Sequence, residues 1–375
     1  MSKKILLFTL QSFSTTGGIQ KMTRTLAHSL NHLATNGKWD FDMYSAYDNN
    51  QDLMPQYLPA KKFRGFNTNR SNFVIQAIKK GIKADVVILT HINLAMVGLI
   101  IKKINPKTKV WLIAHGIEVW RPLSFFQKAF LKHCDKVVCV SDFTKQQMIG
   151  RHNVSQDKCA ILNNAIDPFM QLPTAFVKPQ HLLNKYNLTL DNRVIYTLTR
   201  LANSEQYKGH DQVIKLISRL KVKYPGIKYV LSGQYDINEE VRIKKMIAQD
   251  GIEEDVILTG FIDEKDIPAH FLLADVFVLP SKKEGFGIVF IEALACGLPV
   301  ICGNADGSID AIRNGELGKA VDADNLDELE TAISNVLETS LSSQKRHNLQ
   351  KQCLHYFNED AYMNNLEELL MATNG

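Results

Sequence analysis

Apolar runs and amphipathic stretches alternate along the whole chain. In the first half, short runs rich in β-branched residues predict strands at Lys4–Leu10, Val86–Thr90, Val110–His115, Lys136–Val140 and Cys159–Leu162. The pattern then restarts and predicts strands at Val194–Thr199, Tyr229–Ser232, Val256–Thr259, Val276–Leu279, Val300–Cys302 and Lys319–Val321. Helices are expected between them, the first marked by apolar residues at spacings of three and four, Ile19, Met22, Leu26 and Leu30. This alternation is typical of parallel sheets covered by helices.

The restart of the pattern indicates two domains, for which a chain of 375 residues is long enough. Residues 168–192 hold Pro168, Pro173 and Pro179 with little periodicity, so we place the linker there. We expect an α/β protein with two Rossmann-like, doubly wound domains, over residues 1–172 and 173–359, facing a central cleft that is the default ligand site. An amphipathic helix over residues 360–375 is expected to pack back on the first domain.

The composition, 45% hydrophobic and 22% charged, is that of a folded soluble protein. The apolar run at the N-terminus ends at Gln11, too early for a signal peptide. The stretch Ala84–Ile101 is interrupted by Thr90, His91 and Asn93, so we interpret it as a strand and a helix rather than a membrane span. Six cysteines without a C-x-x-C pair suggest reduced thiols. We therefore expect a cytoplasmic protein that could lie peripherally at the inner face of the membrane.

Charge is distributed unevenly between the halves. Residues 1–175 carry 23 Lys and Arg against 10 Asp and Glu, whereas the rest of the chain carries 21 against 29. The basic residues of the first half include Lys61-Lys62, Lys79-Lys80, Lys102-Lys103, Arg64 and Arg70. They could attract anionic lipid headgroups, and a solvated basic face would explain them equally well. No recognisable motif points to nucleic acid as a partner.

The segment EGFGIVFIEALACGLPV, from Glu284 to Val300, follows an apolar strand and has features of an anion site. Gly285 and Gly287 let the backbone approach a ligand, and the unpaired N–H groups of a helix beginning near Ile288 attract anions such as a diphosphate. The helix is apolar on every face except at Glu292, whose carboxylate needs a partner. A ribose diol would serve, and so would a basic residue of the protein.

In this segment the chain resembles the retaining glycosyltransferases of the GT-B fold, specifically glycosyltransferase family 4. The resemblance lies in their paired-glutamate motif, two glutamates eight positions apart around a glycine-containing helix start, here Glu284 and Glu292. It implies that Glu284 contacts the donor sugar and that Glu292 holds the ribose hydroxyls. It also implies a donor site formed by Gly285 and by the backbone N–H groups of Phe286, Gly287, Ile288 and Val289.

A second element is the strand RVIYTLTRL, which places Arg200 near its carboxyl end, with Lys208 following before a helix. Ligands of open parallel sheets bind at that end, where two cations could neutralise a departing nucleoside diphosphate. The pair resembles the Arg/Lys pair of the family. Two solvated cations near a loop are the alternative.

In the first half, Gly17 and Gly18 stand between the first strand and its helix and resemble the N-terminal glycine loop of the family. They do not form the G-x-G-x-x-G of a dinucleotide site. His115 ends the strand VWLIAHG and resembles the active-site histidine of the family, whereas the other ten histidines, among them His91 at a similar edge, are expected to be structural or exposed.

Phe261, in the segment LTGFID, resembles a family position near the nucleotide base, and a plain strand-end turn explains it as well. No Cys and His spacing indicates a metal, and the only D-x-D, Asp40-Phe41-Asp42, lies far from the predicted donor site. We expect neither a metal nor another cofactor.

Together these features predict a retaining glycosyltransferase with catalytic residues His115, Arg200, Lys208 and Glu284. The donor would be a nucleotide sugar, with UDP-sugars the commonest in the family. The acceptor would be a saccharide or lipid-linked hydroxyl in bacterial surface polysaccharide, lipopolysaccharide or glycolipid assembly. Two alternatives stay open, namely a nucleotide-sugar epimerase or phosphorylase of the same fold and a catalytically silent relative that acts as a binding subunit.

Overall fold

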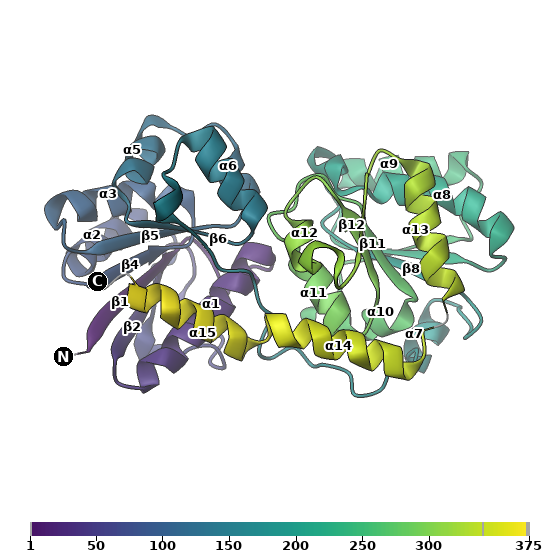
Figure 1. The fold of residues 1–375 in the computed structure, drawn as a ribbon, viewed down its shortest axis with the longest axis horizontal. Coiled ribbons are helices and arrows are strands. Elements are labelled where there is room, and N and C mark those ends of the chain that lie inside the picture. The colour runs from purple at the N-terminus through teal and green to yellow at the C-terminus, as the bar shows by residue number, and fades with distance from the viewer. Residues whose placement is uncertain (1, 340, 373–375) are drawn as a thin grey trace. The chain divides into compact units, whose positions relative to one another are not determined.

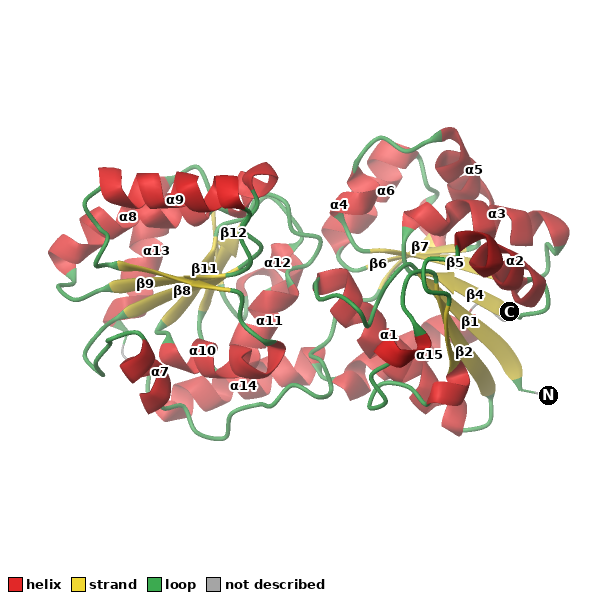
Figure 2. Ribbon diagram, turned by 180° about the vertical axis from the view of Figure 1, so that it is seen from behind, coloured by secondary structure: helices red, strands yellow, loops and turns green. Residues whose placement is uncertain are grey.

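The computed structural model describes residues 2–339 and 341–372. The chain forms two compact units, of which the first comprises the residues up to Pro168 and the C-terminal segment from Phe357, and the second comprises Phe169–Tyr356 (Figure 1). In each unit, helices cover both faces of a parallel sheet (Figure 2). The two doubly wound α/β sheets expected from the sequence are confirmed.

The first unit contains a seven-stranded sheet in the order β3-β2-β1-β4-β5-β6-β7. Its strands are β1 (Lys3–Thr9), β2 (Trp39–Ser45), β3 (Phe63–Gly65), β4 (Val86–Leu89), β5 (Lys109–Ala114), β6 (Lys136–Cys139) and β7 (Cys159–Ile161). The helices are α1 (Gly18–Thr35), α2 (Arg70–Gly81), α3 (Ala95–Ile104), α4 (Ile117–Trp120), α5 (Phe125–His133), α6 (Asp142–His152) and, from the C-terminal segment, α15 (Glu359–Ala372).

Two of these strands, β2 and β3, were not predicted. In β2 the inward-facing residues alternate with Asp40 and Asp42, whose charges hide the apolar pattern. The Lys4 ammonium group from β1 pairs with both carboxylates, at 2.7 Å and 2.5 Å, and Lys62 also pairs with Asp40, so each carboxylate has a cationic partner. The D-x-D of the sequence is therefore part of a strand.

The apolar stretch Ala84–Ile101 forms β4 and most of α3, as predicted. No helix in the described part of the chain is both long and apolar enough to cross a bilayer. All six cysteines are buried free thiols.

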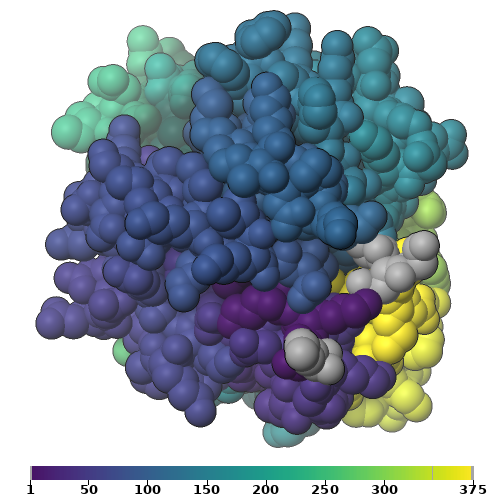
Figure 3. Space-filling model, turned by 90° about the vertical axis from the view of Figure 1, so that its left-hand side faces the viewer, coloured from purple at the N-terminus to yellow at the C-terminus, as the bar shows by residue number. Residues whose placement is uncertain are grey.

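Helix α15 lies beside α1 in the first unit (Figure 1), and in Figure 3 yellow atoms of the C-terminal segment adjoin purple atoms of the N-terminal part. Glu359 pairs with His28 of α1, and Glu367 pairs with Lys38 at 3.2 Å. Tyr362, Leu366 and Leu370 of α15 are buried, which accounts for its amphipathic pattern. The predicted helix over residues 360–375 corresponds to α15, and residues 373–375 lie outside the described residues.

The second unit contains a six-stranded sheet in the order β10-β9-β8-β11-β12-β13. Its strands are β8 (Val194–Leu198), β9 (Lys228–Ser232), β10 (Val256–Gly260), β11 (Val276–Leu279), β12 (Val300–Gly303) and β13 (Lys319–Val321). The helices are α7 (Gln180–Lys185), α8 (His210–Lys223), α9 (Ile237–Gln249), α10 (Ile267–Leu273), α11 (Ile288–Ala295), α12 (Ser308–Ala311), α13 (Leu326–Glu338) and α14 (Ser343–Phe357). Helix α7 lies within residues 168–192, where we expected a linker.

The loop after β1 is fixed by a buried carboxylate that was not predicted from the sequence. Asp48, fully buried after β2, accepts hydrogen bonds from the backbone N–H groups of Ser12, Phe13 and Ser14, at 2.8, 3.3 and 3.0 Å. It also accepts hydrogen bonds from the hydroxyls of Ser14 and Ser45. Hydrogen bonds to a buried carboxylate are strong, so Asp48 sets the path of the chain from β1 towards α1.

We predict that Asp48→Asn lowers the free energy of unfolding of the first unit by about 2–3 kcal/mol, because the amide NH₂ group faces donors that need an acceptor. Urea unfolding checks this. Exposed Asp157, in the same unit, is the control, and Asp157→Asn should stay within about 0.5 kcal/mol of the wild type. Equal stability of the two variants would show that Asp48 does not hold this loop.

Candidate functional site

The order of the strands places a switch point in the second sheet between β8 and β11. From β8 the chain proceeds to β9 on one side of the sheet, and from β11 to β12 on the other. Ligands of open α/β sheets bind beyond the carboxyl ends of the strands at such a point. The loops that leave β8 and β11 contain Arg200 and Lys208 in one case and Glu284 in the other.

The structure brings Lys208 and Glu284 into direct contact. The Lys208 Nζ atom lies 2.5 Å from Oε1 of Glu284, and each side chain is only 14% exposed. Burial alone would lower the pKa of Lys208, but the Glu284 carboxylate outweighs it and the pKa lies above its ordinary value. The Lys208 ammonium group is therefore held charged at the switch point, with little solvent around the pair.

The position of Lys208 depends on a glycine next to it. Lys208 ends a 3₁₀ segment, Asn203–Lys208, and Gly209 then takes the left-handed conformation with φ 83° before α8. A Cβ atom at Gly209 would lie 2.3 Å from the Pro280 carbonyl oxygen, so only glycine allows this approach. The backbone N–H of Lys282 donates to the Tyr207 carbonyl at 3.0 Å, which joins the two loops.

Asp306, a second buried carboxylate, fixes the backbone of the Glu284 loop. It is 1% exposed and accepts hydrogen bonds from the backbone N–H groups of Glu284 at 2.6 Å and Ser308 at 2.9 Å. The N–H of Gly307 donates to the Glu284 carbonyl at 2.8 Å. Burial, and then the nearby Glu284 charge, raise the pKa of Asp306 to about 7. The loop is thus held by a carboxyl group that titrates near neutral pH.

Helix α11 begins directly after this loop. Gly287 precedes it with φ 78°, and a Cβ atom there would lie 2.5 Å from the Phe290 ring. Phe286 is buried, whereas the Ile288 and Val289 positions of the first turn are half-buried, as is Gly285. The first N–H groups of a helix have no partner within it, so an anion could reach them at this turn.

Glu292 lies inside α11 and is 4% exposed. Its charge is close enough to Tyr196 of β8 and to Cys296 to contribute to the raised pKa values of both groups, for which burial is the main cause. The glutamates of the predicted motif therefore differ in setting, with Glu284 on the loop and Glu292 within the helix.

Arg200 and Phe261 lie at the same edge of the sheet but are more exposed. The Arg200 side chain is 71% exposed and pairs with Glu205, and the Nε–Oε2 distance is 3.1 Å. Lys208 pairs with Glu284 instead, so the two cations lie near the switch point without sharing one carboxylate. Phe261 follows β10 and is 54% exposed. An exposed aromatic ring of this kind can stack on a planar ligand.

In the first unit, the carboxyl edge of the sheet holds Gly17, Gly18 and two histidines. Gly17 precedes α1 and Gly18 begins it, and both are exposed. His115 follows β5, and its Nε2 atom is buried without a hydrogen-bond partner among the described residues. Burial, and then nearby His91, lower the pKa of His115 to about 3, so the ring is neutral at physiological pH. His91 accepts from the Asn93 N–H at 3.0 Å and so caps the turn after β4, and its structural role stays a prediction.

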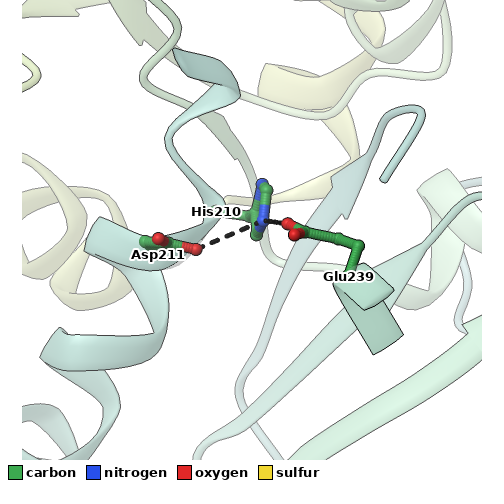
Figure 4. Close-up of side chains that lie close together, drawn as sticks. All are labelled: His210, Asp211 and Glu239. Carbon is green, nitrogen blue, oxygen red and sulfur yellow. Dashed lines mark hydrogen bonds and ion pairs between the residues drawn. The ribbon is translucent and has the colours of Figure 1, made fainter. Parts of the chain in front are cut away.

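One group of side chains in the described part of the chain has metal-ligand spacing. The ligand atoms of His210, Asp211 and Glu239 lie within 4.8 Å of one another (Figure 4). The Arg242 Nη2 atom, however, lies 2.7 Å from Asp211, 2.7 Å from Glu239 and 3.2 Å from the His210 Nε2 atom. A guanidinium group thus supplies the positive charge, and the network ties the start of α8, just after Lys208, to α9.

Several residues of this site were not predicted from the sequence. Tyr207 carries two lysines against its ring, with the Nζ atoms of Lys283 and Lys208 at 5.1 Å and 5.7 Å from its centre. Asp306 and Gly307 form an Asp-Gly dipeptide in the loop after β12, which ends at Gly303. That dipeptide is a turn signal and could have indicated a tight loop at this edge.

Two family models match the chain, one in each unit. The family model described as "Glycosyl transferases group 1" matches residues 182–353, and the model described as "Glycosyltransferase Family 4" matches residues 16–168. The structure is similar to that of Anabaena HepE in complex with UDP, with a TM-score of 0.77, 19% identity and coverage of 98% of this chain and 100% of the other. At that identity the likeness concerns the fold.

Two curated relatives are similar in sequence. A GDP-mannose-dependent α-(1-6)-phosphatidylinositol monomannoside mannosyltransferase of Mycolicibacterium smegmatis is 28% identical over 65% of this chain and 64% of its own length. O-antigen chain mannosyltransferase B of Escherichia coli is 25% identical over 54% of this chain and 51% of its own length. The chain thus matches less than two thirds of the length of these relatives.

The raised pKa of Asp306 predicts a specific pH dependence. Because the folded state binds this proton more tightly than the unfolded chain does, the stabilisation is present at acidic pH and is lost as the pH rises through about 7. The free energy of unfolding of the wild type relative to Asp306→Asn should therefore fall by about 1–3 kcal/mol between about pH 4 and pH 8. Urea unfolding of both proteins checks this, and a pH-independent difference would refute it.

Proposed function

The chain belongs to the GT-B glycosyltransferases of the family 4 type, and from that premise we propose that it transfers a sugar from a nucleotide-sugar donor to a hydroxyl of an acceptor. The observation that carries this proposal is the buried Lys208–Glu284 pair at the switch point of the second sheet. The named functions of the relatives support an acceptor in glycolipid or polysaccharide synthesis, either a saccharide or a lipid-linked saccharide.

In the proposed reaction, the bond between the sugar and the diphosphate breaks and negative charge builds on the leaving group. Lys208 supplies a fixed positive charge, and Arg200 can turn to the phosphates because its side chain is exposed. The first N–H groups of α11 add the partial positive charge of a helix N-terminus. Charges that are already in place stabilise the transition state without reorganisation. The acceptor hydroxyl attacks the anomeric carbon, and its proton passes to an oxygen of the departing diphosphate.

We further propose that the transfer retains the anomeric configuration and that Glu284 positions the donor sugar. A double displacement would need a carboxylate that can reach the anomeric carbon from the face opposite to the leaving group. Glu284 is already paired with Lys208, and Glu292 and Asp306 are buried in the helix and beneath the loop. This arrangement favours attack from the face of the leaving group, with Glu284 oriented by Lys208. Glu292 remains our candidate for the ribose hydroxyls.

The relatives and the family habit suggest different nucleotide bases for the donor. Family habit led us to expect a uridine nucleotide, and the similar HepE structure contains UDP. The Mycolicibacterium relative is named for GDP-mannose. Because sequence similarity to curated proteins bears more directly on substrate than fold similarity does, we propose GDP-mannose as the first donor to test and UDP-sugars as the second.

We propose that no metal ion or other cofactor takes part. Positive charge at the switch point comes from Lys208 and Arg200. Where the described residues do have ligand spacing, at His210, Asp211 and Glu239, the Arg242 guanidinium lies among the ligand atoms.

We predict that Lys208→Met and Glu284→Gln each reduce the rate of sugar transfer by at least about 100-fold, since each removes a charge that acts on the donor. Transfer from GDP-mannose and from UDP-sugars to an acceptor lipid extract measures the rate. The matched control is the exposed pair Lys244–Glu240 on α9, also an ion pair at 2.6 Å, and Lys244→Met should transfer at the wild-type rate.

Thermal unfolding accompanies these assays, because removing one partner of a buried pair also costs stability. A folded Lys208→Met or Glu284→Gln protein with wild-type transfer would refute the role of the pair. Conversion of the donor without any acceptor would instead favour an epimerase or phosphorylase. Donor binding without turnover in the wild type would favour a silent binding subunit.

A further inference from the structure

Two adjacent aromatic side chains project from the first unit. Phe125 and Phe126 begin α5 and are 80% and 51% exposed, with their ring centres 5.6 Å apart. An exposed pair of large apolar rings is unusual on a soluble unit and marks a surface that contacts something. Ser124 caps the helix with a capping box, so the two rings are presented from a fixed helix start.

This pair lies at the carboxyl edge of the first sheet. The chain leaves β5 through His115 and α4 and then begins α5, so the start of α5 is at that edge. Arg121 and Gln127 both donate to the Asn93 side-chain oxygen, at 3.1 Å and 3.2 Å, which ties the region to the loop after β4. The rings are therefore on the side of the unit where an acceptor would approach His115.

The charge around the rings is positive. Arg121, Lys128 and Lys132 are exposed, and Lys128 and Lys132 follow Phe125 at helical spacings of three and seven, on the same face. No Asp or Glu occurs between Arg121 and His133. The preceding Glu118 accepts from the backbone N–H of His115 at 2.6 Å, and its carboxylate also interacts with Arg121, so Lys128 and Lys132 carry most of the positive charge of this face.

The basic pairs singled out in the sequence are placed differently. Lys79-Lys80 and Lys102-Lys103 end α2 and α3, at the opposite edge of the sheet, because these helices run antiparallel to the strands. The Lys102 ammonium group also bonds the Asp135 carboxylate at 2.8 Å. Lys62 is paired with Asp40 at 2.6 Å. Part of the positive charge of these basic residues is thus neutralised within the first unit.

We propose that Phe125 and Phe126, with Arg121, Lys128 and Lys132, form a surface that docks on an anionic lipid bilayer, which we call the α5 surface. Aromatic rings partition to the membrane interface, and cations close to it are attracted by anionic headgroups. The two signals together give reversible binding that neither gives alone. A protein partner fits less well, because lysines are depleted at the centres of protein interfaces.

Membrane docking rests on the proposed function in one respect only, which is that a lipid-linked acceptor would lie in the membrane. Co-sedimentation of the full chain with phosphatidylcholine vesicles, with and without phosphatidylglycerol, tests it. Wild type should bind the anionic vesicles and be released by high salt. The double variant Phe125→Ser, Phe126→Ser should bind at least about tenfold more weakly, and Lys128→Gln, Lys132→Gln should lose the salt-sensitive part.

Two controls match these variants. Ile75→Ser removes a 50% exposed apolar side chain from α2, and Lys79→Gln, Lys80→Gln removes two cations from the opposite edge. Both should bind as the wild type does. Absence of vesicle binding by the wild type, an unchanged Phe125→Ser, Phe126→Ser variant, or an equal loss in the Lys79 and Lys80 control would each overturn the proposal.

Two further measurements distinguish membrane docking from self-association and from a loss of activity. Wild type that self-associates without vesicles, and stops doing so in the phenylalanine variant, would identify a protein interface and overturn membrane docking. Transfer to a soluble saccharide acceptor should stay at the wild-type rate in the phenylalanine variant. Failure of docking with intact transfer would refute only the α5 surface, whereas loss of transfer in Lys208→Met concerns the proposed function.

Discussion

The ion pair between Lys208 and Glu284 is the interaction on which the second unit is organised. Removing two charges from water is costly unless each has a close partner, and here the partners come from loops that are 76 residues apart. Each loop is held where the pair needs it. Gly209 allows contact with the Pro280 carbonyl, and Asp306 accepts the Glu284 N–H. The direct parallel pairing of β8 and β11 brings their carboxyl ends, and with them the two loops, together.

The first unit has the same type of sheet but a different chemistry at its carboxyl edge. Its loops present a neutral histidine, an exposed glycine pair and, further along, the rings and cations of the α5 surface. Buried Asp48 holds the loop after β1 with backbone hydrogen bonds, much as Asp306 holds the loop after β11. Each unit thus has a buried carboxylate that accepts hydrogen bonds from the backbone N–H groups of a loop. In the second unit this carboxylate lies next to the Lys208–Glu284 pair, and in the first unit it lies next to an uncharged polar loop.

The sequence was informative where an element depends on local pattern. The eleven strands predicted from apolar runs are all present, because buried parallel strands are apolar on both faces. Strand β2 was missed because Asp40 and Asp42 interrupt its pattern, and Lys4 from another strand compensates them. For the site, the family resemblance assigned Lys208 and Glu284 to one donor site, and their direct contact is seen only in the structure. The resemblance could not reveal Asp306, Tyr207 or Arg242, whose roles arise only from contacts across the fold.

The most direct test of the central claim is hydrogen exchange of the backbone amides of the full chain with and without GDP-mannose, UDP-glucose and the free diphosphates. If the switch point of the second unit binds the donor, one of these ligands should slow exchange in residues 200–212 and 281–290, and the effect should disappear in Lys208→Met. Protection confined to the first unit, or the same protection in Lys208→Met, would contradict the account.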